Sequence, residues 1–321
     1  MDVLWLLVLG LFLVGWFVLD GFDLGLGATL PLVGRDGYER RAVISAMGPF
    51  FLANEVWLVV TAGLLVGAFP RFESDLLRAF YPLVIALLVA WLARDAAIWF
   101  RSRLTRPGWR RTWDAVLTGA SVLFAVAWGV LFGNLLQGLP AGGPWPSLLS
   151  LVDPFALIAG VTVALVLAAH GATFTAMRLT GPPAERAVAV ARRLALPAAA
   201  ALVLAAVAGA IQPAVRAAVT GAVPALLLVL VGAGALVAGW WLVGRGRHRP
   251  AFLATCLAAA APPLAVGFAV ADRILVGVAD AASLERLNGL ALPILPVLLL
   301  AQVWLWWQFR RRVTAESVVF F

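Results

Sequence analysis

Long apolar stretches alternate with short polar gaps along almost the whole chain. A helix that crosses a lipid bilayer needs about 20 mostly apolar residues. Nine stretches meet this length, at residues 3–30, 50–69, 77–101, 113–137, 153–178, 194–212, 221–244, 250–272 and 289–310. The pattern therefore predicts an all-α, polytopic membrane protein of nine transmembrane helices, with residues 1–321 forming one integral membrane domain.

The composition supports this interpretation. The chain is 63% apolar and 12% charged, whereas soluble domains average about 45–50% apolar and about 25% charged residues. So little polar surface requires that the outer surface face lipid. The net charge of +8 could indicate a nucleic-acid partner. We exclude that partner because the basic residues occur in short clusters beside the apolar stretches and not on a polar domain.

Arginines occupy alternate gaps between the predicted helices. Five alternate gaps, counting the C-terminal tail, hold 18 arginines, the gaps between them hold five, and Arg94 lies inside a predicted helix. Arginine-rich connections stay on the cytoplasmic side of a membrane. The distribution predicts an outer N-terminus and a cytoplasmic C-terminus, and it supports the count of nine, since one missed helix would break the alternation.

A few polar residues fall inside the predicted helices: Asp20, Asp23, Asn54, Glu55, Arg94, Asp95 and His170. A lone charge near the bilayer centre costs at least about 2.5–3.5 kcal/mol, so such residues usually face a partner or a cavity. Asp20 and Asp23 are three positions apart and share a helix face. Arg94 and Asp95 are adjacent, so we expect each to find partners on other helices.

Two interpretations of these residues remain open. They could form a hydrogen-bonded track that admits protons from the cytoplasm, or interhelical ion pairs that fix the bundle. His170 we interpret as a hydrogen-bonded packing residue. With two histidines and three methionines, the chain offers few axial ligands for haem. We therefore expect no metal or haem on this chain, and any redox centres on another one.

Several motifs occur in an order typical of a known family. The run from Asp20 to Gly27 follows the first apolar stretch, and Gly48-Pro49 precedes Asn54-Glu55-Val56-Trp57-Leu58. Phe100-Arg101-Ser102, the run from Gly133 to Gly138 and Asp153-Pro154-Phe155 come later. Over roughly residues 15–175, this order and spacing resembles subunit II of cytochrome bd-type quinol oxidases.

The resemblance implies a fold and a function. Subunit II of that family has two four-helix bundles plus one additional helix, and pairs with a homologous subunit I that holds the haems and the quinol site. The complex lies in the bacterial or archaeal cell membrane, where it oxidises quinol and reduces dioxygen with cytoplasmic protons. Subunit II binds no haem. It contributes acids to proton delivery, can hold a structural quinone and can bind small accessory subunits.

One departure from the family pattern affects the proton path. The family's Trp-Asp-Gly falls here on Phe51, Leu52 and Ala53, and that aspartate is one of the family's proposed proton-path acids. Leucine cannot carry a proton, so Glu55, one helical turn further on, is the candidate substitute. Two alternatives stay open: a secondary transporter with the buried acids as ion-coupling sites, and a catalytically silent scaffold paralogue.

Overall fold

The computed structural model describes residues 1–139 and 147–314. Within these ranges, nine helical segments are long and apolar enough to cross a membrane. Eight are single helices: α1 (Asp2–Val33), α3 (Phe51–Ala68), α4 (Pro70–Arg101), α5 (Pro107–Gln137), α6 (Pro154–Arg178), α7 (Pro182–Ile211), α9 (Ala222–Gly244) and α10 (His248–Val276). The ninth combines α11 (Ala281–Ala291) and α12 (Ile294–Gln308), while the connections contain α2 (Gly37–Met47), the short η1 (Leu148–Leu151) and α8 (Pro213–Ala218).

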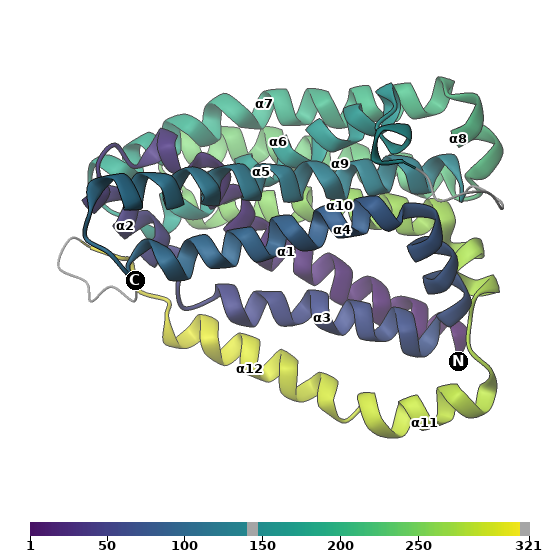
Figure 1. Ribbon diagram of the computed structural model, residues 1–321. Helices are drawn as coiled ribbons and strands as arrows, with labels where there is room; N and C mark the ends of the chain where they lie inside the picture. Colours follow the sequence, from purple (N-terminus) through teal and green to yellow (C-terminus); the bar gives the residue numbers. More distant parts are fainter. Residues whose placement is uncertain (140–146, 315–321) are drawn as a thin grey trace.

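The first eight segments form two rings of four helices. In the first ring, α1 packs on α3 and α5, and α4 packs on the same two helices; in the second, α6 and α9 each pack on α7 and α10. The rings meet where α6 and α10 pack on α1 (Figure 1). There a Cβ added to Gly171 would lie 2.2 Å from the backbone of Gly25, so only glycines allow this approach of α1 and α6. The arrangement of two four-helix bundles plus one helix is confirmed.

The ninth segment lies at the edge of the molecule. Figure 1 shows α11 and α12 running along one side, next to α3. Leu284 is the buried residue of α11 and Gln302 that of α12, whereas Val297, Leu300 and Val303 are exposed. This crossing is also interrupted between Ala291 and Ile294. Its exposed apolar side chains require lipid or another protein against them.

Four helix starts lie six or more residues before the predicted ones. Two of them are the start of α5, at Pro107 and not at residue 113, and the start of the ninth segment, at Ala281 and not at residue 289. α4 begins at Pro70 and not at residue 77, with a break in helical geometry at Phe80 (φ −122°, ψ 22°). The cause is Pro82, which has no N–H to bond to the preceding turn. α7 begins at Pro182, twelve residues before the predicted start at 194. The apolar pattern missed this first part because it is a polar helical extension that carries Arg186, Arg192 and Arg193.

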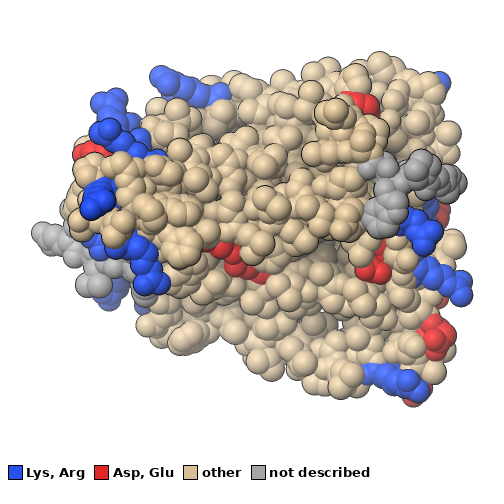
Figure 2. Space-filling view, viewed as in Figure 1, with Lys and Arg blue, Asp and Glu red and all other residues tan. Residues whose placement is uncertain are grey.

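The arginine-rich gaps meet at one end of the bundle. Arg40, after α1, contacts Asp114 of α5, and Arg186 of α7 contacts Glu39 of α2. Figure 2 shows arginines gathered at this end and an uncharged band next to it, interrupted by a small acidic patch on the face shown. Met1 lies at the opposite end from the end of α12 (Figure 1). Which end faces the cytoplasm stays a prediction.

Candidate functional site

Arg94 lies at the centre of a cluster of carboxyl groups inside the first bundle. Its Nη1 donates to both carboxylate oxygens of Asp20, each at 2.9 Å, and its Nη2 donates to Glu55 Oε1. Its Nε lies 3.4 Å from Asp95 Oδ1. The Arg94 side chain is 1% exposed, so this one guanidinium joins α1, α3 and α4 out of contact with water.

The contact between Arg94 and Asp95 corrects one expectation. Adjacent residues point in different directions on a helix, and we expected both to find partners on other helices. Arg94 does, but its long side chain also folds back to its neighbour. The side chain of Asp95 is 24% exposed, and its carboxyl contacts the same guanidinium as Glu55. Asp95 is therefore the member of the cluster nearest the surface.

Asp23 lies beside this cluster and belongs to a second hydrogen-bonded chain. Asn54 Nδ2 donates to Asp23 Oδ2 at 2.8 Å and to the Leu19 carbonyl at 3.1 Å. Asp23 Oδ1 is buried and has no hydrogen-bond partner among the described residues. Because α3 begins at Phe51, Asn54 and Glu55 both lie in its first turns. Asn54 faces α1 and Glu55 faces α4.

The structure adds polar partners that the sequence reasoning missed. Gln302 of α12 donates from Nε2 to Asn54 Oδ1 at 3.0 Å, which connects α12 to Asp23. Trp91 Nε1 donates to Glu55 Oε1 at 3.0 Å. Gln302 could have been recognised from the sequence as a candidate, because it interrupts an otherwise apolar run. Trp91 could not have been recognised in this way, because tryptophans are common in transmembrane helices.

The cluster has more acids than bases. Asp20, Glu55 and Asp95 contact one guanidinium. The fourth acid, Asp23, is bonded to Asn54 beside them. If all four were ionised, three negative charges would lack a cation in a medium of low dielectric constant, which is costly. Such a group lowers that cost by holding protons on some of its carboxyls. Chemically, it can store a proton and pass it between neighbouring carboxyls.

His170 is a packing residue, as expected. Its Nδ1 lies 2.9 Å from Thr255 Oγ1 and its Nε2 lies 2.9 Å from the Val18 carbonyl. Its ring also stacks on Phe252, with centroids 5.1 Å apart. Both nitrogens are engaged, so His170 does not fit the role of an axial haem ligand. The described residues contain no group of three or more His, Cys, Asp or Glu side chains placed to hold a metal ion.

Leu52 is separated from the cluster. Its side chain is 53% exposed, whereas Glu55 is 7% exposed. The two positions are almost one turn apart on α3, yet only Glu55 faces Arg94. A carboxylate at position 52 would therefore lie at the surface of this subunit, outside the contacts of Arg94.

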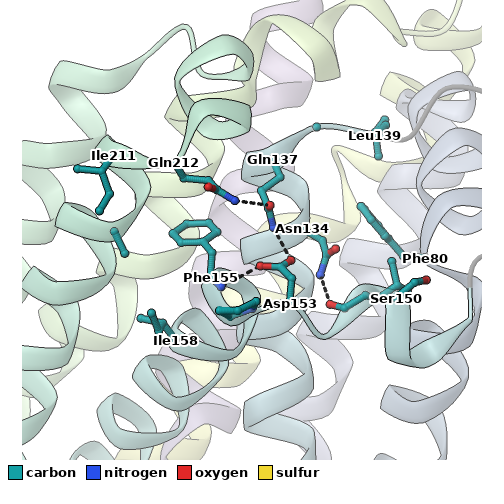
Figure 3. A pocket seen from close by; sticks show the side chains of 14 residues that line it. Phe80, Asn134, Gln137, Leu139, Ser150, Asp153, Phe155, Ile158, Ile211 and Gln212 are labelled. Atoms are coloured by element: carbon teal, nitrogen blue, oxygen red, sulfur yellow. Dashed lines mark hydrogen bonds between the residues drawn. The ribbon is translucent and has the colours of Figure 1, made fainter.

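A second polar group lies towards the other end of the molecule, around a hollow of about 760 Å³ (Figure 3). Gln212 Nε2 donates to Gln137 Oε1 at 3.1 Å, and Gln137 Nε2 donates to Asp153 Oδ2 at 2.7 Å. Asp153 Oδ1 accepts from the backbone N–H groups of Phe155 and Ala156, and so caps α6. This ladder ties α5 to the starts of α6 and α8, and we assign it a structural role.

Comparison with known proteins identifies the family. Residues 1–309 match the family described as cytochrome bd terminal oxidase subunit II. The chain belongs to this family. It is an integral, multi-pass membrane protein, and its relatives place it in the bacterial cell membrane.

Two relatives illustrate the similarity. The chain is 32% identical over 194 residues to the cytochrome bd ubiquinol oxidase subunit 2 of Bacillus subtilis, covering 60% of this chain and 57% of that protein. It is 34% identical over 200 residues to the cytochrome bd-I ubiquinol oxidase subunit 2 of Escherichia coli, covering 60% and 53%. The matched region thus spans about half the length of these curated relatives.

A solved structure shows the same fold over nearly the whole chain. A chain of the bd oxidase from Geobacillus thermodenitrificans superposes with a TM-score of 0.67 and 18% sequence identity, covering 95% of this chain and 98% of that one. At that identity the likeness concerns the fold alone. It confirms the arrangement of helices expected from the motifs.

Proposed function

We propose that this chain is the haem-free subunit II of a cytochrome bd-type quinol oxidase, which assembles with a haem-bearing subunit I and delivers cytoplasmic protons for oxygen reduction. Family membership supports the assignment to the complex. The observation that carries proton delivery is the buried Arg94 with its excess of carboxyl groups. A cluster that served packing alone would need one acid for one base.

The geometry suggests a sequence of transfers. Asp95, the partly exposed acid, takes a proton at the edge of the cluster. Glu55, which binds the same guanidinium as Asp95, receives it. Asp20 shares the same guanidinium, so a proton that leaves Glu55 for Asp20 stays beside a fixed positive charge. Arg94 keeps its own proton and stabilises whichever carboxylate is ionised.

The surface of the first bundle and α12 supports assembly with subunit I. Leu52 and Val59 of α3, Leu92 of α4 and Val303 of α12 are exposed apolar side chains. The ninth crossing has so little contact with the remainder of the chain that a partner would stabilise it. We propose that quinol is a substrate of the complex and that haem, and any structural quinone or accessory subunit, is held in that complex.

Glu55 replaces the missing family aspartate in this proposal. A test combines two substitutions in the assembled oxidase. Glu55→Gln should lower quinol-driven oxygen uptake, and Leu52→Asp added to it should restore part of the rate if the family's usual path is still available. If Leu52→Asp restores none of the oxygen uptake, this chain relies on the Arg94 cluster alone.

The competing function is a secondary transporter, for which the buried ion pairs would be coupling sites. The two functions predict different purified preparations. As an oxidase subunit, the tagged chain should co-purify from its native membrane with a second polypeptide and with haem, visible as a Soret absorption band. A colourless preparation of this chain alone, with oxygen uptake unaffected by its deletion, would contradict the oxidase assignment.

A further inference from the structure

A hollow of about 490 Å³ lies at the arginine-rich end of the molecule, among the ends of α6 and α12 and the first turns of α10. Part of its lining is apolar and includes Phe252 and Trp306. No carboxylate from the described residues lines the hollow. The remainder of the lining includes four guanidinium groups, those of Arg178, Arg249, Arg310 and Arg312. The hollow thus combines concentrated positive charge with an apolar wall.

Backbone contacts bring these arginines together from distant parts of the sequence. The Val313 N–H donates to the Arg178 carbonyl at 2.8 Å, and Leu179 and Val313 form a parallel bridge. The Arg178 side chain donates from Nη1 to the Phe309 carbonyl at 2.5 Å. The segment after α12 is therefore held against the end of α6, which places its arginines beside Arg178.

Arg178 differs from the other buried arginines. Its residue is 6% exposed, its Nε has no hydrogen-bond partner, and no described carboxylate lies within ion-pair distance of it. Arg94 and Arg101, by contrast, both contact carboxylates. A buried guanidinium without a counter-ion is costly. An anion bound in the hollow would supply that counter-ion.

An adjoining hollow repeats the pattern. It is lined by residues 246–250 and Arg312, so it shares Arg249 and Arg312 with the first. His248 Nδ1, within it, is buried and has no partner among the described residues. Two neighbouring hollows therefore present unpaired nitrogen atoms at the same place.

We propose that the larger hollow binds an anionic phospholipid, with its phosphate among the guanidinium groups and part of an acyl chain against Phe252 and Trp306. The arginines lie at the ends of membrane-spanning helices, the level at which a bilayer carries its phosphates. Guanidinium binds phosphate oxygens through paired, charge-assisted hydrogen bonds. A free phosphate would satisfy the arginines but leave the apolar wall facing water.

The test uses the complete chain, purified with whatever subunits accompany it and stripped of lipid in detergent. Palmitoyl-oleoyl phosphatidylglycerol and the matching phosphatidylcholine are added in turn, and bound lipid is counted by native mass spectrometry. We expect tight retention of phosphatidylglycerol and weakening of about fivefold for each arginine replaced, in Arg178→Gln and in Arg249→Gln. Arg245→Gln is the matched control, since Arg245 stacks on Trp241 at the same end but does not line the hollow.

Several outcomes would overturn the proposal. Equal retention of the two lipids, or equal weakening by the Arg245 control, would mean that the hollow does not select phosphatidylglycerol. Competition by inorganic phosphate at equal concentration would assign it to a free anion. Binding that appears only after deletion of residues 315–321 would make the chain's own tail the occupant. If Arg178→Gln fails to accumulate, the same lipid measurement is made with Arg178→Lys and with Arg249→Gln, since Arg249 is exposed.

Discussion

Two ion-pair clusters in the same bundle use the same residue types in opposite proportions. Within the membrane, Arg94 is alone among several acids. At the arginine-rich end, Asp114 is a single acid between two bases, 2.5 Å from Arg101 Nε and 3.1 Å from Arg40 Nη1. Arg40 also donates to the Gly34 carbonyl and Arg101 to that of Gly37. The second cluster fastens α4 and α5 to the connection after α1.

The proportion decides what each cluster can do. Asp114 is paired with two guanidiniums, so it joins the segments that carry them. Carboxyls that outnumber their only cation cannot all be ionised cheaply. We infer that the Asp114 cluster has a structural role and that the Arg94 cluster exchanges protons. Substitutions should separate these two roles.

The largest effect is expected at Arg94. Arg94→Met removes the only cation from a buried group of acids, and breaking such a pair costs about 3–5 kcal/mol. The purified complex should lose most of its yield and melt at a lower temperature. Adding Asp20→Asn to Arg94→Met should recover part of that loss, because it removes an unpaired charge. Normal yield and melting temperature in Arg94→Met would contradict the buried ion-pair network.

A smaller effect is expected at Asp114. Asp114→Asn leaves two arginines with a weaker acceptor and should lower the free energy of unfolding by about 1.5–3 kcal/mol. Thermal melting of the purified complex measures this. Oxygen uptake per haem in the surviving complex should stay unchanged, because Asp114 lies outside the inner cluster. A loss of oxygen uptake per haem, with normal yield of the complex, would contradict the distinction between the two clusters.

The smallest effect is expected at Glu39, which pairs with Arg186 at the surface of the same end. Partial burial opposes its ionisation, but hydrogen bonds from Arg186 and from the Arg35 N–H hold the pKa of Glu39 below its usual value of 4.5. The pair therefore adds stability above that pH and loses it as the pH falls through the lowered pKa. Glu39→Gln should cost at most about 1 kcal/mol at neutral pH.

The melting temperatures of the wild type and Glu39→Gln should converge once the pH has fallen below the lowered pKa of Glu39. A difference that persists in acid would mean that Glu39 acts through packing and not through its charge.

Much of the fold could be predicted because membrane helices are specified by local composition. Within the described residues, the apolar stretches located the nine segments that can cross a membrane, and the arginines predicted their alternation. The starts of α4 and α7 were misplaced because both helices begin with polar turns, which carry charged residues such as Arg71 in α4 and Arg186 in α7. Glycine contacts such as Gly25 with Gly171 depend on which helices are neighbours, which no single helix specifies.

The site could be predicted as a set of residues but not as a network. Asp20, Asp23, Asn54, Glu55, Arg94 and Asp95 were found because charge inside an apolar stretch is conspicuous, and the structure brings all of them together. The pairing of Arg94 with Asp20 and Glu55 depends on how each helix is rotated about its own axis. The link from Gln302 to Asn54 spans 248 positions in the sequence, beyond any local pattern.

The most direct test of the central claim is proton uptake by the assembled oxidase with Glu55→Gln. Glutamine keeps the size of Glu55 and a hydrogen bond to Arg94 or Trp91 but cannot carry a proton. We predict normal haem content, with quinol-driven oxygen uptake and cytoplasmic proton uptake lowered together by at least about tenfold. Unchanged turnover and unchanged proton uptake in a normally assembled complex would contradict proton delivery through the Arg94 cluster.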